Sequence, residues 1–282
     1  MGIFSGMDQF GLGKLDDIDI ISKPSAPKRV IPNDTPVEIP KKEEDFIYDK
    51  HYKCTVCDRP FSAKCVKLGK IKMIKQDTDL RPVYEFMNPA KYDVVSCPFC
   101  GYSSLSRFYG KLSTRNMRDI REKIGYKFEG LDDNAGDIYS YDDAIVRHKL
   151  AVLCSVIKNA KNSERAYTCL KLAWIIRAYR ETLPADSPKQ KSLREDEKEC
   201  LANAYEGFCL AISNEDYPIV SMDENTIQYI LADIARQLGR YEESARLLAK
   251  VLISKTIKKR LKEQALDLKE LLKADIARSK MS

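Results

Sequence analysis

The spacing of hydrophobic positions changes along the chain. Over residues 46–113, apolar and polar residues alternate in short runs bounded by turn-forming residues. The strands predicted from these runs cover residues 66–74, 83–86 and 92–95. Over residues 137–282, apolar residues recur every three or four positions, which predicts a series of helices. The pattern therefore predicts an α+β protein, in which residues 114–136 connect a small β-rich domain to an all-α helical array.

The first 45 residues follow neither period. They contain five prolines spread among Ser, Asn, Asp, Lys and Glu, and they carry 6 Lys and Arg against 9 Asp and Glu. A segment of this composition cannot bury enough apolar surface to form a core of its own. We therefore expect residues 1–45 to be a disordered tail or a linker.

Local signals mark several helix ends in the second half of the chain. Three Ser–x–x–acid pairs have the spacing of a capping box and predict helix starts, namely Ser140–Asp143, Ser192–Glu195 and Ser221–Glu224. Gly239 would end one helix, and the next would cover residues 241–253. A last, highly charged helix would cover residues 256–277.

The predicted helical hairpin at 224–253 has the register of a tetratricopeptide repeat. Its small and large packing positions are occupied by Ala232, Ala235, Gly239, Tyr241, Ser244, Leu248 and Val251. Ser replaces the usual Ala at one of them, and three clean copies at a 34-residue period are not found. An ordinary helical hairpin is the alternative. The first helix would leave four side chains for a protein or peptide partner, or for solvent: Asn225, Gln228, Tyr229 and Arg236.

Two Cys-x-x-Cys pairs carry the clearest chemistry in the chain. Cys54 and Cys57 form the first pair, and Cys97 and Cys100 form the second pair after 39 intervening residues. Each pair would lie on a tight turn that aims two sulfurs at one point, so that two turns close a tetrahedron around a soft cation. We expect one zinc ion, with rubredoxin-type iron as the minor alternative and a disulfide or redox-active pair as a remote one.

Four thiolates would fill the coordination sphere, which is typical of structural zinc rather than catalytic zinc. The residue after each second cysteine needs a positive φ angle, which suits Gly101 and is tolerated by Asp58. The remaining cysteines are interpreted as small core residues: Cys65, Cys154, Cys169, Cys200 and Cys209. His51 is interpreted as a surface or outer-sphere residue, and His148 as a core residue.

Charge adds a second hypothesis about the β-rich segment. Residues 46–113 hold 12 Lys and Arg against 6 Asp and Glu, and four thiolates with a divalent ion would reduce this excess from +6 to +4. Five lysines form a strip that could contact nucleic acid or could simply face solvent: Lys64, Lys67, Lys70, Lys72 and Lys75. The excess is too small for a dedicated nucleic-acid binder.

The remaining features exclude several classes of protein. The longest strongly apolar stretch, Leu150 to Ile157, is far too short for a membrane span, and no secretory signal is recognised. Nine cysteines in a chain without such a signal indicate reduced thiols and a cytoplasmic location. Phosphate-loop, nucleophile-elbow and metalloprotease motifs are not found, so we expect no enzymatic activity.

Two further motifs accompany the paired cysteine turns: an Asp-x-Asp-x-Arg segment at Asp77, Asp79 and Arg81, and an Asn-Pro-x-x-Tyr segment before the second turn. With these motifs, the residues from 46 to about 275 resemble a bacterial family catalogued as domain of unknown function 2225. Thr55 and Asp58 depart from the Pro and Gly frequent in the first turn. The resemblance implies a metal-binding ribbon followed by tetratricopeptide-like helices, and it supplies no reaction.

The function expected from these observations is a non-enzymatic scaffold or adaptor. The ribbon would be structural, and the helical array would bind a protein or peptide partner. Association with nucleic acid through the lysine strip is the alternative. A thiol switch that releases its metal on oxidation is a more remote alternative.

Overall fold

The structure is a computed structural model, and it describes residues 42–110, 112–131 and 136–280. The predicted tail at 1–45 lies almost entirely outside the described residues. Residues Lys41–Ser282 form one compact unit. Within this unit the ribbon and the helices share a cluster of buried side chains. The predicted α+β class is confirmed, with small antiparallel strand pairs preceding a helical region.

The β-rich segment contains three two-stranded antiparallel sheets among the described residues. Their strands are β1 (Ile47–Lys53) with β2 (Pro60–Val66), β3 (Met73–Gln76) with β4 (Pro82–Tyr84), and β5 (Val94–Ser96) with β6 (Ser103–Leu105). Short helical turns lie before and between them: η3 (Glu43–Phe46), η4 (Leu68–Lys70) and η5 (Pro89–Tyr92). The predicted single strand at 66–74 is instead interrupted, because the chain turns at η4 around Gly69.

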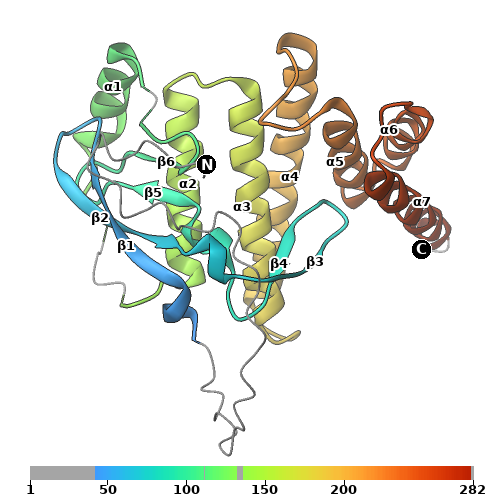
Figure 1. Cartoon of the computed structure of the whole chain (residues 1–282), viewed down its shortest axis with the longest axis horizontal. Helices are drawn as coiled ribbons and strands as arrows, with labels where there is room; N and C mark the ends of the chain where they lie inside the picture. The colour runs from blue at the N-terminus through green and yellow to red at the C-terminus, as the bar shows by residue number, and fades with distance from the viewer. Residues whose placement is uncertain (1–41, 111, 132–135, 281–282) are drawn as a thin grey trace, which may run out of the picture. The chain divides into compact units, whose positions relative to one another are not determined.

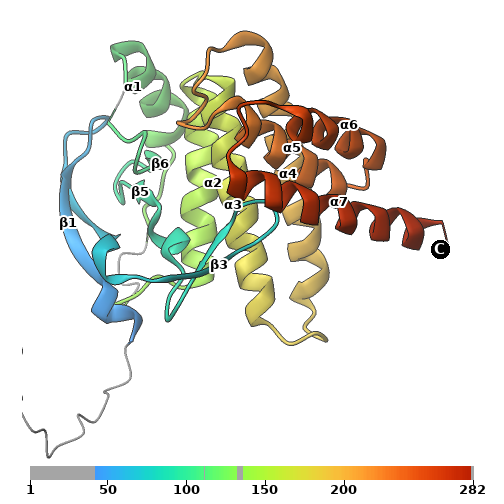
Figure 2. The same ribbon diagram turned by 45° about the vertical axis from the view of Figure 1, so that its right-hand side comes forward.

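The helices begin after the third sheet. They are α1 (Thr114–Ile120) with its continuation η6 (Arg121–Gly125), α2 (Tyr141–Ile157), α3 (Asn162–Thr182), α4 (Lys189–Asn214), α5 (Glu224–Gln237), α6 (Tyr241–Ile253) and α7 (Lys259–Ser279). The α2–α3–α4 helices lie side by side, with the ribbon against α2 and with α5, α6 and α7 beyond α4 (Figure 1). In Figure 2, α7 passes close to the β3–β4 hairpin. The Arg260 guanidinium of α7 donates a hydrogen bond to the Gln76 side chain at the end of β3.

The predicted helix starts had different outcomes. The Ser140 capping box is confirmed, because its hydroxyl accepts from the Asp143 N–H at 3.0 Å and the Asp143 carboxylate accepts from the Ser140 N–H at 2.9 Å. The start at Ser192 is wrong, since α4 begins at Lys189 directly after Pro188, a residue well suited to a helix start. The start at Ser221 is two residues too early, because the Asp223 carboxylate caps α5.

Close packing and one buried hydroxyl explain the helix contacts. A side chain at Gly207 of α4 would place its Cβ 2.9 Å from the Cβ of Ala166, so glycine allows α3 and α4 to approach closely.

In the α5–α6 hairpin, Gly239 has φ of +78° and ends α5 as predicted. Ser244 replaces the usual Ala because its buried hydroxyl donates to the Ala232 carbonyl at 2.7 Å.

Candidate metal centre

The two cysteine turns are the loops of two hairpins and have matching backbone geometry. Cys54 to Cys57 lie between β1 and β2, and Cys97 to Cys100 lie between β5 and β6. The Cys54 N–H donates to the Arg59 carbonyl at 3.0 Å, and the Cys97 N–H donates to the Tyr102 carbonyl at 2.8 Å. Equivalent hydrogen bonds close both loops, so that each loop presents its two sulfurs on the same side.

The conformation after each second cysteine is the one predicted from the sequence. Asp58 has φ of +60° and Gly101 has φ of +71°. At Gly101, an added Cβ would also lie 2.7 Å from the ring of Phe128. Glycine is therefore required in the second turn by both conformation and space, whereas the first turn is open enough to accept Asp.

The four sulfurs converge on one point. The Sγ atoms of Cys54, Cys57, Cys97 and Cys100 all lie within 4.8 Å of one another. Across the two turns, the Cys54–Cys100 and Cys57–Cys97 sulfur distances are both 3.6 Å. Tetrahedral zinc with Zn–S bonds of about 2.3 Å requires sulfur separations of about 3.8 Å. The donor set and its spacing therefore fit a tetrathiolate metal ion, as the sequence predicted.

The hydrogen bonds around the four cysteine sulfurs favour thiolates whose negative charge is balanced by a bound cation. The Val56 N–H points at the Cys54 sulfur at 3.4 Å. Thiol hydrogen bonds from Cys100 and then Cys97 hold the pKa of Cys54 at about 2, whereas hydrogen bonds to Cys54 and Cys97 and then burial raise the pKa of Cys100. One sulfur can ionise readily only if its neighbours stay protonated. A bound divalent cation removes this conflict because it lets all four thiols ionise.

The centre is enclosed and joined to the helices. Cys54, Cys97 and Cys100 are buried, and Cys57 is partly buried. Cys154 of α2 lies in the same apolar cluster, and its sulfur accepts from the Ser103 N–H at 3.4 Å. The second cysteine turn is thus fixed directly against α2, which explains why ribbon and helices form one unit.

The residues that the sequence analysis assigned to the core or to the surface of the ribbon and α2 lie outside the cluster. His51 is on the exposed face of β1, where its Nδ1 is 2.8 Å from the Ser62 hydroxyl of the neighbouring strand. The Cys65 sulfur is 3.4 Å from the Tyr52 hydroxyl. His148 is fully buried, and its Nδ1 donates to the Ala144 carbonyl at 2.8 Å. Of the described His, Cys, Asp and Glu residues, the four predicted cysteines form the group that could hold a metal ion.

The Asp-x-Asp-x-Arg segment forms the tip of the β3–β4 hairpin and enters the helical region. Asp79 is completely buried, and its carboxylate accepts from the Trp174 indole at 3.0 Å and pairs with Arg177 at 2.8 Å. Thr78 donates to Asp233 of α5 at 2.8 Å. The Arg81 guanidinium pairs with Glu181 at 2.7 Å. The segment therefore connects α3 and α5 through buried polar contacts, a role that its sequence alone did not indicate.

The side chains predicted to be free for a partner on α5 are mostly engaged. Tyr229 is 2% exposed and packs in a cluster with residues of α6 and α7. Asn225 donates to the Thr256 hydroxyl at 3.0 Å, and Arg236 pairs with Asp275 of α7 at 2.6 Å. The expectation of free side chains is wrong for these three residues, because α7 and the segment before it cover this face. Gln228 is partly exposed and bonds to the adjacent Glu224.

The lysine strip does not lie on one strand. Lys64 is in β2 and pairs with Asp49 at 3.6 Å, and Lys67 donates to the Asp45 carbonyl. Lys70, Lys72 and Lys75 are exposed along η4 and β3. Only the last three therefore present ammonium groups to solvent as the nucleic-acid hypothesis requires.

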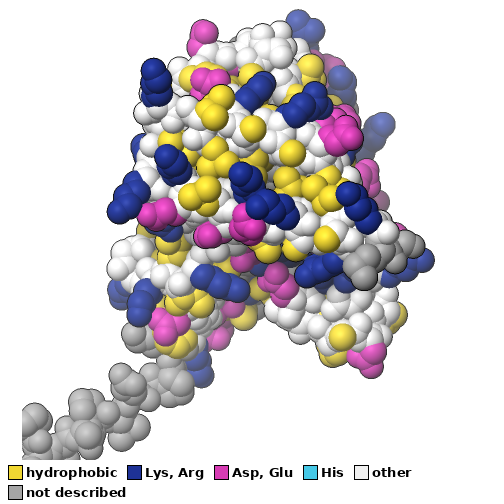
Figure 3. Space-filling view, turned by 90° about the vertical axis from the view of Figure 1, so that its right-hand side faces the viewer, with side chains coloured by type: hydrophobic (Ala, Val, Ile, Leu, Met, Phe, Trp, Pro, Cys, Tyr) yellow, Lys and Arg dark blue, Asp and Glu magenta, His cyan; other side chains and the backbone are white. Residues whose placement is uncertain are grey.

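A further basic surface lies on α6 and α7. Residues 246–262 contain seven Lys and Arg and no Asp or Glu, a charge run that counting by segment would have revealed. Figure 3 shows Lys and Arg side chains around hydrophobic ones on this side of the molecule. Exposed apolar side chains there include Ile253, Leu266 and Leu271.

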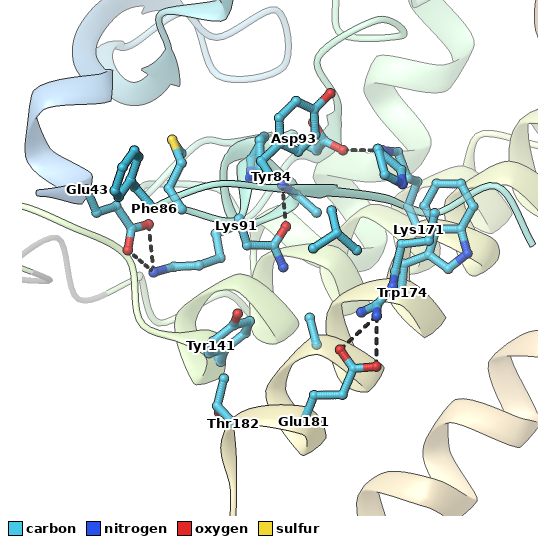
Figure 4. Close-up of a pocket in the computed structure, with 18 of the residues that line it drawn as sticks. Glu43, Tyr84, Phe86, Lys91, Asp93, Tyr141, Lys171, Trp174, Glu181 and Thr182 are labelled. Atoms are coloured by element: carbon cyan, nitrogen blue, oxygen red, sulfur yellow. Dashed lines mark hydrogen bonds and ion pairs between the residues drawn. The ribbon is translucent and has the colours of Figure 1, made fainter. Parts of the chain in front are cut away.

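Figure 4 shows a pocket of about 450 Å³ lined by β4, η5 and α3. Three ion pairs border it: Lys91–Glu43 at 2.8 Å, Lys171–Asp93 at 2.5 Å and Arg81–Glu181 at 2.7 Å. Aromatic rings of Tyr84, Tyr141 and Trp174 complete its walls. Because each of these cations already has a carboxylate partner, the described lining offers no unpaired positive charge to an anionic substrate.

Comparisons with known proteins place the chain in a family. A search of curated proteins and a search of solved structures find no match. Among the described residues, no helix has the length and apolar character needed to cross a membrane. A family model described as an uncharacterized protein conserved in bacteria, DUF2225, matches residues 47–272. This range includes both cysteine turns and most of the helical region, so the chain belongs to the DUF2225 family.

Proposed function

We propose that this protein is a non-enzymatic adaptor in which one zinc ion holds the ribbon and the helical region binds a protein partner. The observation that carries the proposal is the convergence of four cysteine sulfurs within 4.8 Å. A catalytic metal keeps a coordination position for water or substrate, whereas four thiolates leave none. Zinc is favoured over iron because a closed, buried tetrathiolate site in a small β-rich unit is the usual form of structural zinc.

The chemistry that zinc would supply is a cross-link between the two cysteine turns. Binding of structural zinc contributes on the order of 10 kcal/mol to folding in small domains. Here the cross-link would also fix α2, because Cys154 packs among the metal-site residues. The helical region would thereby be held in one arrangement, which suits a protein that presents a surface rather than one that performs a reaction.

The adaptor function is tested by affinity capture of the full-length protein from its native cells, with and without nuclease. The expected result is a protein partner that survives nuclease treatment. The Cys97→Ser variant should lose both metal and partner. A Cys209→Ser variant changes a cysteine outside the metal centre and should retain both. Capture of no protein by the zinc-loaded chain would contradict the adaptor function.

Nucleic-acid association is the second candidate, favoured by the exposure of three lysines on η4 and β3. Lys70, Lys72 and Lys75 are all solvent-exposed, and exposed Met73 and Ile74 lie between them. Their Lys→Glu triple variant should then abolish retention on single-stranded nucleic acid, and retention should fall steeply with salt concentration. If retention is absent or insensitive to these changes, the lysines are a solvated surface.

A further inference from the structure

A second concave surface lies on the opposite side of α3 from the pocket of Figure 4. Lys171 and Trp174 of α3 border that pocket, whereas Cys169, Leu172 and Ile176 line a groove of about 560 Å³. Its walls come from α2 and α4, between which α3 lies (Figure 1). Val156 on one wall is 52% exposed and Leu210 on the other is 53% exposed. The groove is therefore open, with an apolar floor and an exposed apolar side chain on each wall.

Each of the three helices contributes residues at the spacing of a helix–helix seam. On α4, Cys200 and Gly207 line the groove beside a series with 3-4-3-4 spacing: Asp196, Glu199, Asn203, Glu206 and Leu210. On α3, Ala166 lies beside a series with the same spacing: Asn162, Arg165, Cys169, Leu172 and Ile176. On α2 the series has 3-4 spacing over Lys149, Val152 and Val156, and Ser155 lies beside it. This is the spacing with which one helix packs along another, so the groove is shaped for a fourth helix.

The length of the groove and the polarisable sulfur atoms on its floor also suit a helix. The lining residues of α4 span fifteen positions, from Asp196 to Leu210, which corresponds to about 21 Å of helix axis. Cys169 and Cys200 are partly exposed on its floor, where polarisable sulfurs adapt to the shape of an incoming side chain.

The charges on the walls indicate the chemistry of the partner. Lys149 pairs with Asp196 at 3.5 Å across the groove. Within the described part of the chain, Glu199 and Glu206 have no cation at ion-pair distance, and they are seven residues apart on the same face of α4. The Arg165 guanidinium at one end donates to the Asn159 side chain. The α4 wall therefore offers two unpaired carboxylates, two helical turns apart, to a basic partner.

We propose that this groove binds an amphipathic α-helix of a protein partner. The apolar stripe of that helix packs on α3, and its Lys or Arg side chains pair with Glu199 and Glu206. This inference rests on the proposed adaptor function, and it names the surface and the class of partner. It replaces the face of α5 favoured by the sequence, which α7 covers.

Two fluorescent synthetic peptides of about 20 residues test the proposal, since this length allows a stable amphipathic helix. Both have the same Leu and Ala stripe, and one carries Lys where the other carries Glu. Binding to the full-length, zinc-loaded protein is measured by fluorescence anisotropy. The chain has a net charge of +6, so general electrostatic attraction would favour the Glu peptide. A preference for the Lys peptide therefore reports the local charge of the groove.

The expected result is that the Lys peptide binds at least about tenfold more tightly than the Glu peptide. The double variant Glu199→Lys/Glu206→Lys should reverse this preference. The matched control Glu263→Lys/Glu270→Lys, with the same charge change and spacing on exposed positions of α7, should leave it unchanged. Leu210→Glu on the exposed rim should abolish binding of the Lys peptide while the circular dichroism spectrum stays helical.

Three outcomes would overturn the proposal. One is that neither peptide binds, and another is that the Glu199→Lys/Glu206→Lys variant keeps the original preference. The third is a dimer in sedimentation that this variant dissociates, because the groove would then be occupied by a second copy. If the peptides fail while nuclease-resistant capture of a protein persists, the adaptor function stands and only this surface is wrong.

Discussion

The Asp79 carboxylate accepts a hydrogen bond from the Trp174 indole at 3.0 Å, although 95 positions separate the two residues. Asp79 lies at the tip of the β3–β4 hairpin, and Trp174 lies in the middle of α3. The same carboxylate pairs with Arg177, which also pairs with Glu197 of α4 at 2.6 Å. The Asp79 carboxylate, which comes from the segment between the cysteine turns, is therefore the shared partner of Trp174 and Arg177 in the helical region.

Replacing Asp79 by Ala should destabilise the protein by about 3 kcal/mol, because it leaves a buried guanidinium and a buried indole N–H without this acceptor. Chemical denaturation at a fixed zinc concentration measures the change. The control Asp49→Ala removes a partly exposed ion pair with Lys64 at 3.6 Å and should cost no more than about 0.5 kcal/mol. Equal effects of the two substitutions would contradict a structural role for the hairpin tip.

The two cysteine turns should differ in their tolerance of substitution. Gly101→Ala should lower the free energy of unfolding by about 2 kcal/mol, because it adds strain at positive φ and a Cβ that meets the Phe128 ring. Asp58→Gly should be neutral or slightly stabilising, since it removes the cost of positive φ at an exposed position. Thermal melts of both variants, with metal content as a control, distinguish these outcomes. A Gly101→Ala variant as stable as the wild type would be inconsistent with the turn geometry.

Stability should fall between pH 6.5 and pH 4 because of His148. Burial lowers the pKa of His148 from 6.5 to about 4, so the folded state favours the neutral ring. In this window the unfolded chain binds the proton more tightly, and stability is present above pH 6.5 and lost as pH falls toward 4. The full contribution is about 3 kcal/mol. His148→Gln should flatten the dependence of the unfolding free energy on pH over this window, relative to the wild type. An unchanged slope would contradict the burial of a neutral ring.

Metal removal should lower the thermal stability of the helices and not only that of the ribbon. Cys154 of α2 shares a buried cluster with Cys54, Cys97 and Cys100, and its sulfur accepts from the Ser103 N–H. We expect the Cys97→Ser variant to melt at a lower temperature when helicity is followed by circular dichroism at 222 nm, with Cys209→Ser as the control. If the helical transition stays at the wild-type temperature after metal loss, the ribbon and helices fold independently.

Sequence reasoning succeeded where the determining signal is local. The four clustered cysteines were identifiable because each Cys-x-x-Cys turn is defined by four consecutive residues, and both positive φ angles follow from the residue after the turn. The bounds of α6 were predicted correctly because Gly239 ends the preceding helix. Ser140 and Asp143 likewise fix the start of α2 through their own side chains.

Contacts between distant segments could not be predicted in this way. The tip of the β3–β4 hairpin reads as a polar turn, and nothing near Asp79 in the sequence indicates that Trp174 and Arg177 are its partners. Tyr229 was assigned to a free surface because its own helix does not need it for packing. Its burial depends on α7, whose Leu261 and Leu268 join the same cluster. The groove beside α3 was missed for the same reason, since it exists only when three helices are assembled.

If the four cysteines hold one structural zinc ion, the purified protein contains a fixed amount of metal. The full-length protein is purified under reducing conditions without chelators, and its zinc and iron contents are measured by inductively coupled plasma mass spectrometry. We expect about one zinc per chain and negligible iron, with loss of the metal in Cys97→Ser but not in Cys209→Ser. A metal content near zero in the wild-type protein, or one zinc per chain that persists in Cys97→Ser, would show that these cysteines do not hold a structural zinc ion.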